Sequence, residues 1–229
     1  MDAPILHRMV TWVSRGCIVN TVRLLIFVRG VDWRVIHAAP LPPEGTPLLF
    51  VSNHIDWHDA PLIGWAIPDT FHLWWFAKAE LLAHWMGWWF RMLPMIPVQR
   101  GTGDATALQA AVECVRAGNP MVIFPEGTWD DGRLLRAKTG AVRIALESGA
   151  VIVPIGVTGR MQPLWFRPRS ITFGPSFRLD DLPSYRHAND IHEQSLTDLT
   201  TDVMHRIAAL LPVEYHGYYA LSQNSATES

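Results

Sequence analysis

The apolar run PLLFV at residues 47–51 leads, after Ser52, into NHIDWHD at residues 53–59. A short apolar run of this kind is typical of a buried strand. Open α/β folds hold their binding and catalytic groups at the carboxyl ends of such strands, in the crevice outside the sheet. The stretch therefore predicts a site at the end of a central strand, with His54 and Asp59 as its candidate pair.

Apolar runs and segments with helical periodicity alternate along the rest of the chain. The clearest helix follows Asp104, a capping residue, and is stopped by Gly118. Thr139 is expected to cap another helix that ends at Gly149. The expected strands are residues 31–37, 48–51, 71–77, 95–100, 121–124 and 151–157, with an edge strand at 171–173; the other expected helices are residues 61–66, 80–90 and 196–210. This alternation predicts an α/β fold with a central, mainly parallel sheet flanked by helices.

Composition narrows the class of protein. A chain of 229 residues, 49% of them hydrophobic, can bury one sizeable core, so we expect one main domain. The formal charge of −2 gives no electrostatic reason to expect nucleic acid as a partner. Cys17 and Cys114 are far apart, which indicates neither a disulfide framework nor a thiolate metal site and suits a reducing cytoplasmic setting.

Residues 1–30 have the composition of a helix that lies on a membrane. Large apolar side chains are mixed with Arg8, Arg15, Arg23 and Arg29, and residues 3–31 contain no acidic residue. Arg15 and Arg23 interrupt the apolar run too early for a spanning helix, whereas arginines favour contact with an anionic leaflet. We expect an N-terminal membrane-docking segment, with an ordinary helix packed on the core as the alternative.

Tryptophan is concentrated next to the predicted site. Seven of the 11 tryptophans lie between residues 57 and 89. Leu81, Trp85, Trp88 and Trp89 would form one apolar stripe on the helix expected over residues 80–90. Such a stripe fits packing in the core, and it fits equally well an interfacial belt or the wall of an acyl-chain site.

A histidine and a nearby carboxylate can act together as a general base. Ionised Asp59 would fix the tautomer of His54 and stabilise its imidazolium, leaving the second ring nitrogen to take a proton from a hydroxyl group. The sequence has no Gly-x-Ser-x-Gly segment, so we expect the substrate hydroxyl to be the nucleophile and the transfer to be direct. On spacing alone, a purely structural hydrogen-bonded pair is the alternative.

Two further readings concern the same stretch. His54, His58 and Asp59 have spacing that suits a metal site, but the sequence suggests no further ligand of matching type, and we expect no metal. Asp56 either changes the proton affinity of His54 through its charge or simply faces water.

A second group of candidates surrounds FPEGT at residues 124–128, which follows another apolar run. Gly127 allows a ligand to approach the backbone closely, and the Thr128 hydroxyl can donate to an anion such as phosphate. Arg100 and Lys78 follow short strands and are candidates for phosphate contacts. Taken singly, each of these features also fits an ordinary loop or surface residue.

Five segments, taken in order, resemble the motifs of the lysophosphatidic acid acyltransferase (PlsC-like) family of glycerolipid acyltransferases. They are NHIDWHD (53–59), KAEL (78–81), IPVQR (96–100), FPEGT (124–128) and VIVPIGV (151–157). The resemblance spans about residues 30–160. It implies an acyltransferase domain over residues 31–215, preceded by the docking segment at residues 1–30 and followed by a disordered tail at residues 216–229.

The resemblance also implies a reaction. An acyl group would pass from acyl-CoA or acyl carrier protein to the sn-2 hydroxyl of lysophosphatidic acid, giving phosphatidic acid, with His54 as general base and Asp59 as its partner. The residues implied to bind substrate are Lys78, Arg100, Glu126, Gly127 and Thr128. No metal ion or organic cofactor is implied, and the expected location is peripheral, on the cytoplasmic face of the cell membrane.

Two positions depart from the family pattern. Asp56 stands where the family usually has a small hydroxyl residue, and Trp129 stands where an arginine is common. Loss of that arginine removes one phosphate contact, so a lyso-glycolipid or a lyso-ornithine lipid is an alternative acceptor. A non-catalytic lipid-binding protein with this fold is a further alternative, although such a protein has no reason to retain both His54 and Asp59.

Overall fold

The computed structural model describes residues 13, 16, 17, 20, 24, 33–68, 70–83, 87, 91, 93–99, 104–159, 168–186 and 192–220. Seven strands form one sheet in the order β1-β7-β6-β2-β5-β3-β4. The strands are β1 (Trp33–His37), β2 (Leu48–Ser52), β3 (Trp74–Lys78), β4 (Met95–Val98), β5 (Met121–Ile123), β6 (Val151–Thr158) and β7 (Arg169–Phe173). Neighbouring strands are parallel except β6 and β7, so the predicted mainly parallel sheet is confirmed.

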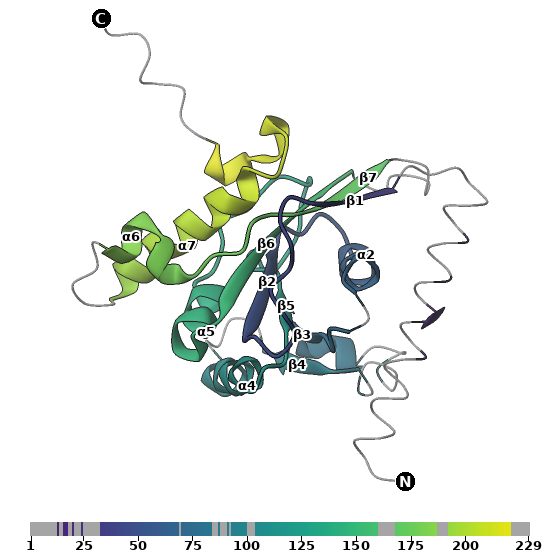
Figure 1. The fold of residues 1–229 in the computed structure, drawn as a ribbon, viewed down its shortest axis with the longest axis horizontal. Coiled ribbons are helices and arrows are strands. Elements are labelled where there is room, and N and C mark those ends of the chain that lie inside the picture. The colour runs from purple at the N-terminus through teal and green to yellow at the C-terminus, as the bar shows by residue number, and fades with distance from the viewer. Residues whose placement is uncertain are drawn as a thin grey trace, which may run out of the picture.

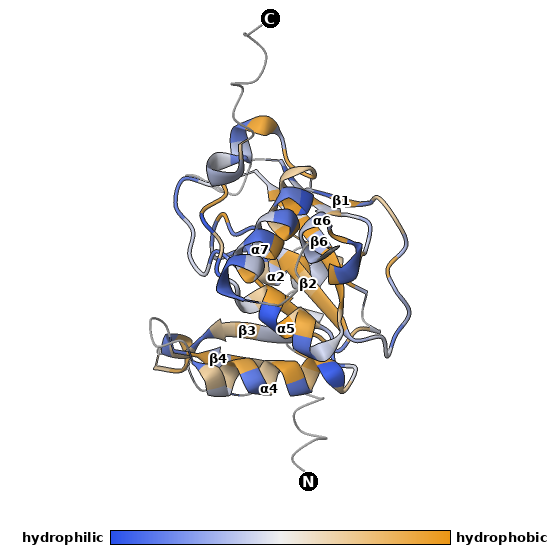
Figure 2. Ribbon diagram, turned by 90° about the vertical axis from the view of Figure 1, so that its left-hand side faces the viewer, coloured by the Kyte–Doolittle hydropathy of each residue, from blue (hydrophilic) through white to orange (hydrophobic). Residues whose placement is uncertain are grey.

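Helices cover both faces of this sheet. Figure 1 shows α4, α5 and α7 on one face and α2 on the other. The helices are α2 (Asp59–Ala66), α4 (Ala105–Arg116), α5 (Gly140–Ser148), α6 (Pro183–Arg186) and α7 (Glu193–Ala208), with short 3₁₀ segments η1 (Ala79–Ala83), η2 (Leu179–Asp181), η3 (Val213–Tyr215) and η4 (Gly217–Tyr219). In Figure 2, hydrophobic and hydrophilic residues alternate along α4 and α5, as expected for helices with one buried side.

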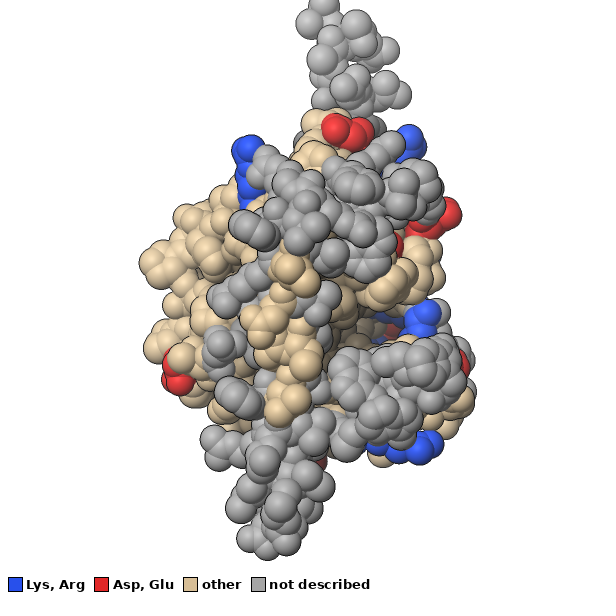
Figure 3. Space-filling view, turned by 90° about the vertical axis from the view of Figure 1, so that its right-hand side faces the viewer, with Lys and Arg blue, Asp and Glu red and all other residues tan. Residues whose placement is uncertain are grey.

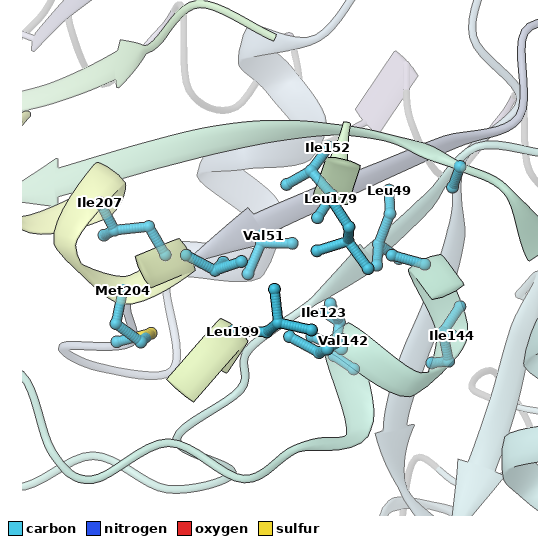
Figure 4. Close-up of a cluster of buried hydrophobic side chains, with 14 of the residues drawn as sticks. Leu49, Val51, Ile123, Val142, Ile144, Ile152, Leu179, Leu199, Met204 and Ile207 are labelled. Atoms are coloured by element: carbon cyan, nitrogen blue, oxygen red, sulfur yellow. The ribbon is translucent and has the colours of Figure 1, made fainter. Parts of the chain in front are cut away.

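Strand β2 is the centre of the core because both of its faces are covered. Leu49 and Val51 belong to the cluster under α4, α5 and α7, which Figure 4 shows, and they pair with Ile152 of β6 and Ile123 of β5 respectively. Leu48 and Phe50 point to the other face and pack in the cluster that includes residues of α2. A strand buried on both faces reads as a continuous apolar run, which explains the PLLFV sequence.

The end of β2 is joined to β6 by an asparagine. Asn53 is 1% exposed, and its Nδ2 donates to the Val157 carbonyl at 2.9 Å, while the Val157 N–H donates to its Oδ1 at 2.7 Å. The amide side chain therefore continues the pairing of the two strands after the chain has left the sheet. This fixes the position at which His54 leaves β2.

Three local expectations were wrong. Residues 171–173 are not an edge strand, because β7 pairs with β1 on one side and with β6 on the other. Thr139 precedes α5 but makes no side-chain cap, because its backbone is already helical and its Oγ1 accepts from Arg143 Nε instead, at 3.3 Å. The tail does not begin at residue 216, because Tyr219 is buried and its hydroxyl accepts the Ala137 N–H at 2.9 Å.

Some expectations lie wholly or partly outside the described residues. These are most of the N-terminal segment, three tryptophans of the predicted stripe (Trp85, Trp88 and Trp89), Arg100 and the chain after residue 220. The described part of the helix expected at residues 80–90 begins as η1. Among the described residues, no helix combines the length and the apolar character needed to cross a bilayer.

We expect Asn53→Ala to lower the free energy of unfolding by about 2 kcal/mol, because it leaves the buried N–H and C=O of Val157 without their partner. Urea denaturation measures this loss. The control is Gln109→Ala, which removes an amide from the exposed side of α4 and should change stability by less than about 0.5 kcal/mol. Equal losses in the two variants would contradict a structural role for Asn53.

Candidate active site

The predicted His54 and Asp59 lie in direct contact at the carboxyl end of β2. His54 Nδ1 is 2.8 Å from Asp59 Oδ2. His54 belongs to the loop that leaves β2, whereas Asp59 is the first residue of α2 and is fully buried. The tight turn between β2 and α2 therefore brings the carboxylate back to the histidine.

The hydrogen bonds to Asp59 define which nitrogen of His54 carries the proton. Asp59 Oδ2 also accepts the backbone N–H groups of Ile55 at 2.6 Å and Asp56 at 2.9 Å. A carboxylate held by donors in this way is an acceptor, so the neutral imidazole presents its Nδ1–H to Asp59. Its Nε2 then carries the lone pair that can take a proton from a hydroxyl group.

Aromatic rings enclose the imidazole of His54. Phe124 stacks on it with ring centroids 4.2 Å apart, and the Trp129 ring meets it at 67° with centroids 4.6 Å apart. Lys78 Nζ lies 5.1 Å from the centre of the Trp129 ring. The His54 side chain keeps 12% of its surface exposed, so the base is shielded but accessible. Trp129 thus contacts both Lys78 and His54.

Glu126 holds the loop that carries His54. Its Oε1 accepts the His54 N–H at 2.9 Å, and its Oε2 accepts the Leu135 N–H at 2.6 Å. Burial raises the pKa of Glu126 to about 7; these two hydrogen bonds oppose the rise and the charge of Asp59 adds to it. Through these two hydrogen bonds the carboxyl group therefore holds the His54 loop in place. Its implied contact with substrate stays a prediction.

The turn after Glu126 has the backbone geometry expected of FPEGT. Gly127 has a φ of 68°, which favours glycine, and a Cβ there would lie 3.6 Å from Lys138 Nζ. Thr128 is exposed beside it. The structure thus places Gly127 and Thr128 next to the residue that braces His54, while their substrate contacts stay predictions.

Asp56 is largely buried, and its carboxylate contacts His58 and Arg169. It is 9% exposed, and its Oδ1 accepts the His58 N–H at 2.8 Å and lies 3.0 Å from His58 Nδ1. Its Oδ2 pairs with Arg169. Burial alone would raise the pKa of Asp56, but the His58 hydrogen bonds and the charge of Arg169 outweigh it and lower the pKa to about 2.

Arg169 is the residue of the site that sequence reasoning missed. It is the first residue of β7, it is 2% exposed, and it contacts both Asp56 and Asp59. Its distance along the chain from the 53–59 motif gave no signal. The alternation of side chains along a strand did carry a signal. Arg169 shares a strand face with Ile171 and Phe173 and is therefore expected to be buried with them.

The metal interpretation of His54, His58 and Asp59 finds no support in this geometry. Within the described ranges, no group of three or more His, Cys, Asp or Glu residues is arranged to hold a metal ion.

Comparison with known proteins agrees with the fold and with an acyltransferase family. A family model described as Acyltransferase matches residues 34–158. The lyso-ornithine lipid O-acyltransferase of Pseudomonas aeruginosa is 36% identical over 118 residues, covering 50% of this chain and 44% of that protein. The 1-acyl-sn-glycerol-3-phosphate acyltransferase of Limnanthes douglasii is 30% identical over 168 residues, covering 64% of this chain and 57% of that protein.

A solved structure has the same fold. The 1-acyl-sn-glycerophosphate acyltransferase PlsC of Thermotoga maritima superposes with a TM-score of 0.60 at 21% identity, covering 86% of this chain and 79% of that one. The family match spans more than half of the 229 residues, so the chain belongs to the acyltransferase family. This agrees with the acyltransferase resemblance of the sequence motifs. The chain spans 44% and 57% of the lengths of the two curated relatives named above.

The raised pKa of Glu126 predicts a pH-dependent stability. The folded carboxyl group binds its proton more tightly than the unfolded one, so its contribution is full below pH 4.5 and is lost as pH rises to about 7. The Glu126→Gln variant does not titrate at this position, and its loss of hydrogen bonding is the same at every pH. We therefore expect the difference in Tm, wild type minus variant, to shrink between pH 4.5 and 7 in thermal denaturation. A difference that is constant or grows over this range would contradict the assignment.

Proposed function

We propose that the chain transfers a fatty acyl group from acyl-CoA or acyl carrier protein to the sn-2 hydroxyl of lysophosphatidic acid, giving phosphatidic acid. The observation that supports this most directly is the 2.8 Å contact between His54 Nδ1 and Asp59 Oδ2. It leaves Nε2 as the ring nitrogen that can act as the base. The family match supports acyl transfer as the reaction.

The proposed reaction is a direct transfer of the acyl group, without an acyl-enzyme intermediate. His54 Nε2 takes the proton of the acceptor hydroxyl while the hydroxyl oxygen attacks the thioester carbonyl, and buried Asp59 stabilises the imidazolium that forms. The tetrahedral intermediate then collapses, the C–S bond breaks, and the thiolate takes the proton from His54. The products are an ester and a free thiol. Because a thioester is already activated, this chemistry calls for no metal ion or organic cofactor.

We also propose that the protein works at the cytoplasmic face of the membrane. Of the N-terminal segment, the described residues Val13, Cys17, Asn20 and Leu24 are exposed and uncharged. In Figure 3, which shows the α2 side, the described surface is mainly uncharged. Both features suit contact with lipid.

Release of free thiol from acyl-CoA tests the proposal. With purified protein and lysophosphatidic acid, we expect His54→Ala to lower kcat by about 10²- to 10⁴-fold, the usual contribution of a positioned base. The control His192→Ala removes an exposed histidine at the start of α7 and should leave the rate unchanged. If wild type and His54→Ala release thiol equally, His54 is not the base.

A lyso-ornithine lipid is the second candidate acceptor, and Trp129 favours it. Trp129 contacts the base directly and covers Lys78, at a position where the family commonly has an arginine. An indole ring in place of a guanidinium offers no charge to a phosphate group. The similarity to a protein named lyso-ornithine lipid O-acyltransferase points the same way.

Acceptor preference separates the two candidates. We expect Trp129→Arg to raise the ratio of kcat/KM for lysophosphatidic acid over lyso-ornithine lipid by about tenfold, the effect of one charge-assisted contact of about 1.5 kcal/mol. Trp57→Arg adds the same charge at another exposed tryptophan near the site and should leave the ratio unchanged. An equal change in both variants would assign the effect to surface charge and not to acceptor binding.

A further inference from the structure

We propose that Arg169 and Asp56 together are positioning residues, which hold Asp59 against His54 and keep the net charge beside the base at that of a single carboxylate. The inference rests on the proposed function, since it concerns the same base. It joins two features that the family motifs leave unexplained: the acidic residue at position 56 and the buried arginine of β7.

The two carboxylate oxygens of Asp59 have different partners. Asp59 Oδ2 receives His54 and the two loop N–H groups, whereas Oδ1 receives Arg169 Nη1 at 3.1 Å. Arg169 Nη2 pairs with Asp56 Oδ2, so the guanidinium bridges two carboxylates three residues apart. The Arg169 side chain is 1% exposed and the Asp59 side chain 0%, so water does not screen this bridge effectively.

The topology of the sheet explains how a residue so distant in sequence reaches the site. Strand β7 is antiparallel to β6, so its first residue lies where β6 ends, as the pairing of Thr158 with Ser170 shows. Gly159 has a φ of 84°, and a Cβ there would clash with the Pro168 carbonyl. Only a residue without a side chain allows this close approach, which sets Arg169 at the carboxyl edge of the sheet.

The charges indicate why Asp56 and Arg169 occur together. An arginine paired with Asp59 alone would neutralise the carboxylate that must stabilise the imidazolium of His54. Asp56 supplies a second negative charge, and the three groups together carry a net charge of −1. A serine or threonine at position 56, as the family usually has, gives the same net charge only where no buried arginine is present.

Other charged groups also face the base and are common to every variant compared. Glu126 accepts the His54 N–H, Lys78 lies over the Trp129 ring, Lys138 lies near Gly127, and His58 is bonded to Asp56. Comparison of variants that differ only at positions 56 and 169 keeps their contributions constant.

The test is the protonation of His54, followed by NMR of its imidazole during a pH titration and by the acidic limb of the kcat/KM profile. Asp56→Asn keeps the shape of the side chain but leaves the arginine uncompensated. We expect the midpoint and the acidic limb to move to lower pH by about one unit, because the imidazolium loses a nearby negative charge. The double variant Asp56→Asn/Arg169→Met restores the net charge, and both readouts should return toward the wild-type values.

A matched control removes a carboxylate from an exposed ion pair. Glu193 pairs with Arg143 at 2.7 Å and is 76% exposed, so Glu193→Gln should leave both readouts unchanged. A purely structural bridge predicts that the double variant is at least as impaired as Asp56→Asn, with no displacement of the His54 midpoint. That result would overturn the proposal.

The two proposals fail in different ways. A shifted His54 midpoint in Asp56→Asn, with no release of thiol by the wild type with either acceptor, would overturn the proposed function. Active wild-type protein whose His54 midpoint is the same in Asp56→Asn would overturn the role of Arg169 and Asp56 and leave the acyl transfer standing.

Discussion

The arrangement of the site depends on one buried carboxylate, Asp59, at the start of α2. It holds the imidazole of His54, accepts two N–H groups of its own loop, and pairs with Arg169. A buried charge without such partners would be costly, and the first turn of a helix adds favourable N–H dipoles. The loop between β2 and α2 therefore has its shape because this carboxylate must be satisfied, and the position of the base follows from the same hydrogen bonds.

Much of the fold was predictable because both faces of the sheet are buried. Strands such as β2, β5 and β6 read as apolar runs, and the helix after Asp104 carries both a capping residue and a clear apolar side. Asp104 does cap α4, since its side chain accepts the Ala107 N–H at 3.0 Å. The interior position of β7 was not predictable, because strand order depends on pairing across the sheet and three apolar residues do not report their neighbours.

The active site, like the fold, was predictable from the sequence only in part. The contact of His54 with Asp59 follows from their short separation and the turn between them, so sequence reasoning reached it. The bracing of His54 by Glu126 and the bridge from Arg169 depend on how distant segments meet, which no local pattern encodes. Asp56 shows the difference most clearly: the sequence left open whether its charge acts on His54 or it faces water, whereas its contacts with His58 and with an arginine on another strand are known only from the structure.

The long separations within the site have a consequence for how the chain folds. Asn53 is bonded to a residue 104 positions later, and Arg169 reaches back 110 and 113 positions to Asp59 and Asp56. Contacts this distant form late, because a long loop must close before they contribute. During synthesis, the 53–59 loop thus lacks its distant partners Val157 and Arg169 until β6 and β7 have left the ribosome and joined the sheet. Assembly of the base is in this way coupled to completion of the sheet.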